Sequence, residues 1–343
     1  MHKKLKSILI ALAAAIPLAV SAAPFQDVLD TPAMQSPLAA KTPLNGIAFA
    51  GKRVVAVGQR GHIVYSDDGG KSWQQAKVPV SSDLVAVAFP SQQQGWAVGH
   101  DGVVLHTADG GITWIKQLDG IGAGKLMQSF YAGTDAADEA SRIANQGAEN
   151  PFLDVWFDDD NTGYIVGAFN LIFRTVDGGK TWEPWFHRTE NDKRLHLYAI
   201  RRIGGGLYIS GEQGLFLKLD ESGNRFAAID TGYRGTYFGV TGADDAVLAF
   251  GLRGNVYRSI DGGKQWQKIE TGLPEGITGA SSCGGKRLVL VSQSGRMLVS
   301  DDAGEHFRPA PLKQTAPAAA VLCTAGDLAI IASARGVQAQ AFK

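Results

Sequence analysis

Five short stretches of the chain place an acidic residue at a fixed distance from a large aromatic, and they are the first candidates for chemistry. They read SDDGGKSW (66–73), TADGGITW (107–114), TVDGGKTW (175–182), SIDGGKQW (259–266) and SDDAGEHF (300–307). Such a carboxylate could act as a general acid or base, or could donate an oxygen ligand to Ca²⁺. Alternatively, it could shape a turn, because Asp and Ser side chains bond to nearby backbone groups.

The spacing of these stretches favours the role in shaping a turn. Asp68 and Asp109 are 41 residues apart, and so are Asp261 and Asp302. The glycines supply positive φ angles, and the aromatic buries a large apolar area. We therefore predict that these residues fix a hairpin at the outer edge of a repeated sheet. The residues of this motif, the Asp-box or bacterial neuraminidase repeat, are Asp68, Trp73, Asp109, Trp114, Asp177, Trp182, Asp261, Trp266, Asp302 and Phe307.

Other catalytic patterns are missing from the sequence. There is no G-x-S-x-G elbow and no H-E-x-x-H helix, and the seven histidines show no metal-ligand spacing. We predict no catalytic residue, no metal site and no cofactor. Hydrolysis of a glycoside by two carboxylates stays open as the alternative, because Asp and Glu are plentiful.

Arginines are the second set of candidates. Apolar runs end in G-x-x-G turns whose third position varies, and three of these positions hold Arg60, Arg253 and Arg335. In a closed ring they would lie on one arc of one face, beside Arg234 and Tyr237 in the stretch TGYRGTYFG. Arginine can grip a carboxylate through two hydrogen bonds, so these five residues are predicted to bind a partner. The alternative is that they are ordinary solvated side chains.

The elements that carry these residues repeat seven times. Each unit of about 41 residues has an apolar run, a second run, the glycine turn, a third run, the acidic turn and a fourth run. Four short strands at this period are typical of a β-propeller blade. We predict an all-β fold: a seven-bladed β-propeller of four-stranded blades. The last unit has only three runs, so we expect the N-terminal stretch FQDVL (25–29) to close its blade as the fourth strand.

One insertion interrupts the repeat. Residues 119–150 lie between the second and third units, and their composition predicts two helices, over 125–131 and over 135–147. We expect this insertion to rise from the face that carries the arginines and to contact a partner. Residues 23–343 would form a single domain.

The first 22 residues indicate export. Three lysines precede an apolar run at 8–20 and small residues, which is a signal-peptide pattern too short for a membrane span. Its removal takes three of the 33 basic residues and leaves all 33 acidic ones, a balance that does not indicate a nucleic-acid binder. Cys283 and Cys323 are 40 residues apart, so they would occupy equivalent positions in neighbouring blades. In an oxidising compartment they could form a disulfide, or they could remain two buried thiols.

The recurring module VGxxGxIxxSxDGGxxW, nearly intact at 57–73, 98–114 and 250–266, resembles the photosystem II stability/assembly factor-like propellers. The resemblance runs through residues 44–342. It implies an exported seven-bladed propeller, lumenal in photosynthetic organisms, that binds newly made reaction-centre subunits through an arginine-rich patch. The positions that match this patch are Arg60, Arg253 and Arg335.

The expected function is therefore that of a non-enzymatic scaffold for assembly. It would bind a membrane protein complex or its subunits, and it would be monomeric and periplasmic, or lumenal in a photosynthetic host. The alternative is a secreted propeller that binds or cleaves glycans.

Overall fold

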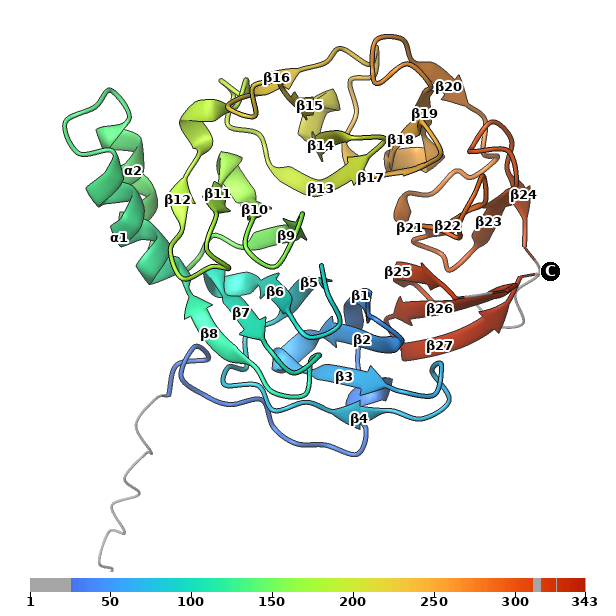
Figure 1. The fold of residues 1–343 in the computed structure, drawn as a ribbon, viewed down its shortest axis with the longest axis horizontal. Helices are drawn as coiled ribbons and strands as arrows, with labels where there is room; N and C mark the ends of the chain where they lie inside the picture. The colour runs from blue at the N-terminus through green and yellow to red at the C-terminus, as the bar shows by residue number, and fades with distance from the viewer. Residues whose placement is uncertain (1–25, 311–315, 325, 343) are drawn as a thin grey trace, which may run out of the picture.

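The computed structural model describes residues 26–310, 316–324 and 326–342. Within these residues the strands form seven antiparallel sheets, which stand as blades around a central axis (Figure 1). The first strand of every blade is the innermost, and it contacts the first strands of both neighbouring blades. The predicted seven-bladed propeller is confirmed.

The blades follow one another in chain order. The strands of blades 1 to 3 are β1 (Leu44–Ala50), β2 (Arg53–Gly58), β3 (Ile63–Ser66), β4 (Gln74–Gln75); β5 (Leu84–Ala88), β6 (Gly95–Gly99), β7 (Val104–Thr107), β8 (Ile115–Leu118); β9 (Phe152–Phe157), β10 (Gly163–Gly167), β11 (Ile172–Thr175) and β12 (Glu183–Pro184). Those of blades 4 and 5 are β13 (Leu197–Ile203), β14 (Gly206–Gly211), β15 (Phe216–Leu219), β16 (Phe226–Ala228); β17 (Tyr237–Ala243), β18 (Ala246–Gly251), β19 (Val256–Ser259) and β20 (Gln267–Ile269). Those of blades 6 and 7 are β21 (Ile277–Ser282), β22 (Leu288–Ser292), β23 (Met297–Ser300), β24 (Arg308–Pro309); β25 (Ala318–Cys323), β26 (Leu328–Ser333) and β27 (Gly336–Ala341).

Helices are few and short. The α-helices of the described residues are α1 (Gly120–Phe130) and α2 (Ala137–Asn145). The 3₁₀ turns are η1 (Ala39–Lys41), η2 (Gln59–Gly61), η3 (His100–Gly102), η4 (Ala168–Asn170), η5 (Phe186–Arg188), η6 (Glu212–Gly214) and η7 (Leu252–Gly254).

The second strands explain why the ring is stable. In β6 and β10 every residue is buried, because a sheet inside the ring has a neighbouring blade on both faces. The aromatic Trp96 of β6 stacks on Phe157 of the next blade, with ring centroids 3.6 Å apart. Burial of apolar area between neighbouring sheets therefore holds the blades together.

Local hydrogen bonds hold each acidic turn. The Asp68 Oδ1 atom accepts the backbone N–H of Ser72 at 2.9 Å and the Ser66 hydroxyl at 2.8 Å. The Ser66 oxygen accepts the Gly70 N–H, and the indole N–H of Trp73 donates to the Gly70 carbonyl at 3.2 Å. The same carboxylate bonds recur at Asp109, Asp177, Asp261 and Asp302. In the structure these carboxylates shape the hairpin between the third and fourth strands.

These donors lower the pKa of all five Asp-box carboxyls. The side-chain hydroxyl of Ser72 is the largest influence on the pKa of Asp68. At Asp302 burial opposes the shift, but the donors from His306 and Ser300 outweigh it and lower the pKa to about 2.

The prediction that residues 25–29 form the fourth strand of blade 7 is wrong. Phe25 lies outside the described residues, and residues 26–29 enter a turn in which Asp27 Oδ1 accepts the Leu29 N–H at 2.9 Å. In the described part of the chain the last sheet contains β25, β26 and β27 alone.

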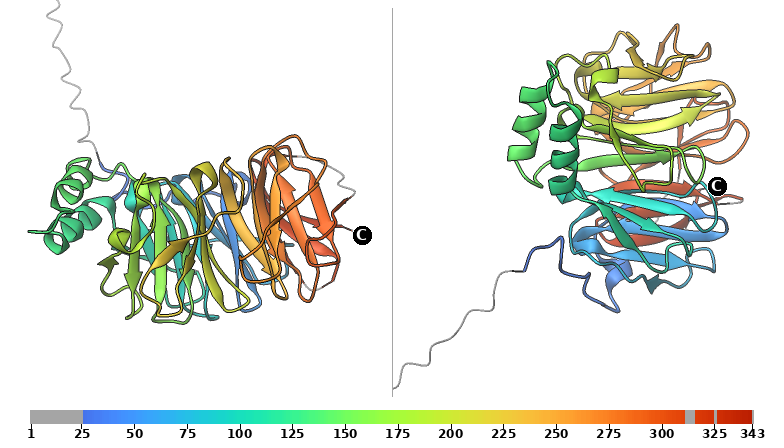
Figure 2. Two further views of the ribbon diagram at one scale, coloured as in Figure 1. Left: turned by 90° about the horizontal axis from the view of Figure 1, so that it is seen from above. Right: turned by 60° about the vertical axis from the view of Figure 1, so that its left-hand side comes forward.

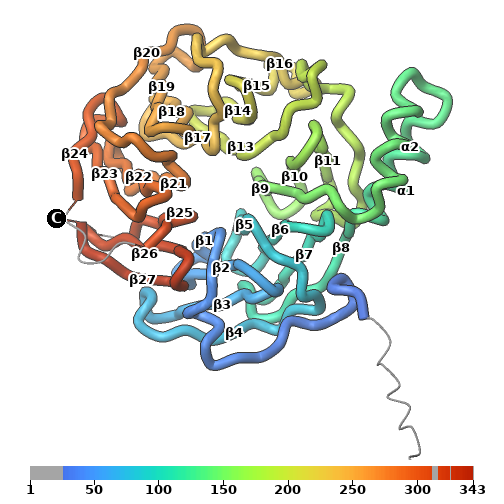
Figure 3. The backbone as a smooth tube through the Cα atoms, turned by 180° about the vertical axis from the view of Figure 1, so that it is seen from behind, coloured from blue at the N-terminus to red at the C-terminus, as the bar shows by residue number. Residues whose placement is uncertain are grey.

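The N-terminal segment instead runs along the outside of blade 1 (Figure 3). The Lys116 ammonium of blade 2 donates to the Leu29 carbonyl at 3.0 Å, and the Ala33 N–H donates to the Val78 carbonyl at 3.1 Å. η1 follows and contacts both blade 1 and β27. The ring thus closes through packing of β1 against β25 and of η1 against β27, without an exchanged strand.

The insertion forms a helical hairpin that projects outward from the rim of the ring (Figures 1 and 2). α1 begins at Gly120, earlier than predicted, because Asp119 caps it by accepting the Gly122 N–H at 2.9 Å. α2 matches its predicted position, although its first turn lacks a side-chain cap. The hairpin contacts the outer strand β12 of blade 3, so it does not cover the central axis.

Cys283 and Cys323 form a disulfide, with Cα atoms 5.1 Å apart. They follow or end the innermost strands β21 and β25, so the bond joins blade 6 to blade 7. The predicted signal peptide (1–22) lies outside the described residues. Among those that are described, no helix has the length and apolar character needed to cross a membrane.

We predict that the disulfide stabilises the closed ring. It closes a loop of 40 residues, and the loss of that constraint on the unfolded chain corresponds to about 4 kcal/mol. Cys283→Ser/Cys323→Ser should therefore unfold at a lower urea concentration than the wild-type protein. Reductant should lower the wild-type midpoint to that of the double variant and leave the variant unchanged. Equal midpoints for the oxidised wild type and the variant would contradict this prediction.

We also predict a dependence of stability on acid. The pKa values of the Asp-box carboxyls are lower in the folded state than in the unfolded state. These carboxyls therefore stabilise the fold at any pH above their unfolded pKa of about 4, and that stabilisation is lost as the pH falls toward 2. Asp109→Ala should lower Tm at pH 7 by about 5 °C, since it removes several bonds to a charged acceptor. That difference should shrink below pH 3. Glu221→Ala, at an exposed site in the degenerate turn of blade 4, is the control and should leave Tm unchanged.

Candidate functional site

One end of the ring is defined by a hydrogen bond that every blade repeats. The first residue after each second strand donates its N–H to the carbonyl just before, or at the start of, the first strand of the same blade, at 2.8–3.2 Å. The pairs are Gln59 with Pro43, His100 with Asp83, Ala168 with Pro151, Glu212 with His196, Leu252 with Thr236, Gln293 with Gly276, and Ala334 with Pro317. We call this end the upper face. The Asp-box turns lie at the opposite end.

The third position of the upper turns adopts a left-handed backbone in five blades. The φ angles there lie between 51° and 58°. The residues are Arg60, Asp101, Phe169, Gln213 and Arg253. Because these side chains differ in size and charge, the turn does not dictate which residue occupies the position. This position is therefore free to serve recognition.

Arg60, Arg253 and Arg335 are all exposed on the upper face. The backbone N–H of Arg60 donates to Asp83 Oδ1 at 2.7 Å, and that of Arg335 donates to the Ser333 hydroxyl at 3.2 Å. Among the described residues, none of the three guanidinium groups has an ion-pair or hydrogen-bond partner. Blades 5, 6, 7 and 1 are consecutive neighbours, so the three cations occupy one arc of the face.

The two other predicted contact residues differ from each other. Arg234 is exposed, and its guanidinium forms an ion pair with Asp230 at 2.8 Å. Tyr237 is fully buried, with its hydroxyl 2.6 Å from the hydroxyl of Thr231, and burial raises its pKa. The prediction that Tyr237 contacts a partner is therefore wrong. As the first residue of β17, its side chain turns into the interface between blades, and the partly exposed ring there belongs to Tyr233.

A cavity of about 660 Å³ occupies the centre of the ring. The first strands of blades 1, 2, 6 and 7 line it mostly with aliphatic and small residues, among them Gly46, Ala86, Gly279 and Ala319. Blades 3 to 5 contribute larger and charged side chains as well, among them Asp154, Tyr198, Arg201 and Phe238.

An ion pair between blades 3 and 4 forms part of that polar wall. The Asp154 side chain is buried, and its Oδ2 atom accepts a hydrogen bond from the Ile200 N–H at 2.8 Å. The same oxygen forms an ion pair with the Arg201 guanidinium. Burial raises the pKa of Asp154, and Arg201 counteracts that effect. Sequence reasoning missed this pair. The signal was a single acid in the apolar run FLDVWF (152–157) and an arginine in LYAIRRI (197–203).

Aromatic rings lead from the upper face into the cavity. The ring of Phe169 lies edge-on to that of His196, with ring centroids 4.6 Å apart. The rings of His196 and Tyr198 also meet edge to face, with centroids 6.1 Å apart. Tyr198 in turn lies 6.0 Å from Phe238 across the boundary between blades 4 and 5. Phe169 is 41% exposed, so the outer end of this series is accessible to a partner.

The chemistry of the cavity does not favour the glycosidase alternative. Hydrolysis of a glycoside needs two carboxyl groups that face each other across the bond, about 5–10 Å apart. Among the described residues that line the cavity, Asp154 supplies the one carboxylate, and Arg201 neutralises it. The described residues also contain no cluster of three His, Cys, Asp or Glu side chains that could hold a metal ion.

The insertion packs on blades other than those that carry the arginines. α1 contacts η3 of blade 2 and β12 of blade 3, whereas the three arginines lie on blades 5, 7 and 1. Glu139 of α2 contacts Arg142 at 2.7 Å and also Arg194 from the connection after blade 3, so the hairpin is fixed to the ring by a buried carboxylate. Because η3 is the upper turn of blade 2, the hairpin does rise beside the upper face, next to the blade that carries Arg60.

Solved structures of related fold share this architecture. A structure of YCF48 bound to a D1 peptide matches with a TM-score of 0.66 at 16% identity, covering 90% of this chain and 96% of that chain. YCF48 from Cyanidioschyzon merolae matches with a TM-score of 0.67 at 18% identity, covering 90% of this chain and 98% of that one. At these identities the likeness shows the fold.

Curated relatives share sequence as well. The photosystem II stability/assembly factor HCF136, chloroplastic, of Arabidopsis thaliana is 23% identical over 241 residues, which are 65% of this chain and 55% of the relative. The photosystem II assembly lipoprotein Ycf48 of Synechococcus sp. (strain CC9902) is 29% identical over 160 residues, which are 46% of this chain and 47% of the relative. The chain thus spans about half the length of these relatives.

A family model covers more of the ring than either pairwise match. The model described as photosynthesis system II assembly factor YCF48 matches residues 32–120 and 134–272. The gap between the two segments falls within the helical insertion, which is the part that departs from the repeat. On this match and on the seven-bladed fold, the chain belongs to the photosynthesis system II assembly factor YCF48 family.

Proposed function

We propose that this protein is an exported, non-enzymatic scaffold that binds a membrane protein complex, or its assembling subunits, through the upper face of the propeller. The observation that supports this best is the arc of exposed arginines, Arg60, Arg253 and Arg335, whose guanidinium groups have no partner among the described residues. An exposed guanidinium without an internal partner is available for a bidentate contact with a carboxylate.

Family membership supports a role in assembly. Relatives are photosystem II assembly factors by name, and the YCF48 structure named above is bound to a D1 peptide. For this chain the partner would be a polypeptide with acidic groups that face the arginine arc. Arg234 would take part only after it exchanges its contact with Asp230 for one with the partner.

Two observations support export. Residues 1–22 have the composition of a signal peptide, and a disulfide links Cys283 and Cys323. The site of action would be the periplasm, or the thylakoid lumen in a photosynthetic host. The chain would act there as a monomer, without a cofactor and without nucleic acid.

We predict that charge reversal on the upper face weakens partner binding. Arg60→Glu/Arg253→Glu should reduce the membrane protein recovered by crosslinking and pull-down from the native envelope by about tenfold or more, since each charged contact contributes about 1.5–3 kcal/mol. The matched control is Lys71→Glu/Lys264→Glu, which reverses two exposed charges on the Asp-box turns of the same two blades. The control should retain the partner. Equal recovery with both double variants would contradict the proposal.

A further inference from the structure

Blade 7 lacks the fourth strand that each of the other blades has in the described part of the chain. β27 is therefore an edge strand at the depth of β3 and β23, while β4 and β24 extend one strand further out on either side. The vacant position is about 4.8 Å wide, the spacing of paired strands. A strand edge of this kind offers unpaired N–H and C=O groups to another polypeptide.

The register of β27 shows which groups are free. The Phe342 N–H donates to the Asp327 carbonyl on the β26 side, at 2.9 Å. The backbone N–H and C=O groups of successive residues point to alternate sides of a strand. Those of Val337, Ala339 and Ala341 therefore point away from β26. None of these three residues has a hydrogen bond on that side to any described residue. Ala339 and Ala341 are also exposed.

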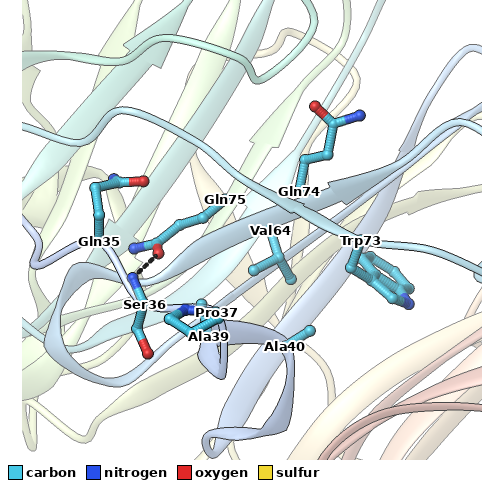
Figure 4. A pocket seen from close by; sticks show the side chains of 9 residues that line it. All are labelled: Gln35, Ser36, Pro37, Ala39, Ala40, Val64, Trp73, Gln74 and Gln75. Carbon is cyan, nitrogen blue, oxygen red and sulfur yellow. Dashed lines mark hydrogen bonds between the residues drawn. The ribbon is translucent and has the colours of Figure 1, made fainter.

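A hollow lies between residues 35–40 and the side of blade 1 that packs against blade 7. It has a volume of about 460 Å³, and Val64, Trp73 and Ala40 form its apolar wall (Figure 4). Val64 belongs to a buried apolar cluster, and Val337 of β27, Trp73 and Ala40 pack against that cluster. In blade 2 the equivalent Trp114 is only 4% exposed, and its backbone N–H donates to the carbonyl of Lys77, just beyond β4 of the preceding blade, at 3.0 Å. Among the described residues Trp73 has no such backbone partner, so a fourth strand in blade 7 would lie beside it.

Charge marks the upper end of the vacant position. β27 begins at the upper face with Gly336, and Arg335 immediately precedes it. Lys41 of η1 lies against Gly336: a Cβ on that glycine would come 2.0 Å from the Ala40 carbonyl oxygen and 2.6 Å from the Lys41 Cα, so η1 bounds the vacant position at its upper end. Both cations are exposed, and neither side chain has a partner among the described residues. A strand antiparallel to β27 would run toward the upper face, so its C-terminal end would arrive beside these two cations.

We propose that β27 takes the extended C-terminal segment of a protein partner as the fourth strand of blade 7, with the terminal carboxylate held by Lys41 and Arg335. Backbone bonds to Val337, Ala339 and Ala341 provide affinity, and an apolar side chain of the segment enters the hollow at Trp73. The inference rests on the proposed function in one respect, namely that the partner is a polypeptide.

Two other occupants fit less well. The described N-terminal segment begins on the far side of blade 1, against Lys116, and the expected mature chain starts only three residues earlier, a reach of about 10 Å. A second copy of the propeller would meet β4 and β24 of the first before its own edge could reach β27, because β27 is recessed by one strand. A single extended segment meets neither obstacle.

The probe is a pool of randomised octapeptides with free C-terminal carboxylates, captured on the mature chain, with the same pool as C-terminal amides for comparison. We expect enrichment of sequences that alternate apolar and polar residues. Amidation should weaken binding by about tenfold, since it removes a contact between charged groups. Lys41→Ala should weaken binding of the free acids and leave that of the amides unchanged. Ala339→Pro should abolish binding of both pools, because it removes an outward N–H without removing a bond to β26.

Hydrogen exchange on the wild-type protein makes the test independent of whether the proline variant folds. Bound peptide should slow exchange at the amides of Val337, Ala339 and Ala341 and leave the other blade edges unchanged. The inference is overturned if no peptide is enriched, if those amides are not protected, or if the chain is a dimer that Ala339→Pro dissociates. The Arg60→Glu/Arg253→Glu variant should still bind the peptides. Loss of envelope partners in that variant without any peptide binding at β27 would therefore overturn this inference and leave the proposed function intact.

Discussion

The structure depends on the need to cover two apolar faces of every sheet. A four-stranded blade cannot bury both faces alone, so each blade requires a neighbour on either side, and the requirement ends only when the ring closes. The fully buried strands β6 and β10 show how strict this is. Closure in turn brings arginines from blades 5, 7 and 1 onto one arc of the upper face, although Arg60 and Arg335 are separated by most of the chain.

The acidic turns at one end of the ring and the upper turns at the other have different roles. In the Asp-box turns, carboxylates such as Asp109 are occupied by donors within four residues, which leaves them little capacity for a ligand. In the upper turns, the backbone bond to the start of the first strand fixes the loop and leaves the third side chain unused. The same repeat therefore supplies a rigid end and a variable end. This is why a recognition role is assigned to the upper face.

Much of this could be predicted from the sequence, because the period of 41 residues and the Asp-box are local patterns with fixed geometry. The predictions that were wrong concern contacts between distant segments. Residues 26–29 turn at Asp27 and follow blade 1, a path that depends on side chains such as Lys116 in blade 2. Tyr237 starts a strand whose first residue faces the neighbouring blade, and its burial depends on Thr231 and on the rings around it. The pair of Asp154 and Arg201 likewise joins two blades, so neither residue indicated it alone.

The short range of the Asp-box bonds has a consequence for how the chain folds. Every one of them joins residues no more than four positions apart, so each hairpin can form before its blade meets a neighbour. The contact between β1 and β25, by contrast, joins opposite ends of the chain and carries the entropy cost of a very long loop. Sealing the ring is thus expected to be the last and slowest event in folding. During synthesis, the first blade would therefore expose one apolar sheet face to solvent until the strands of the last blade have been made.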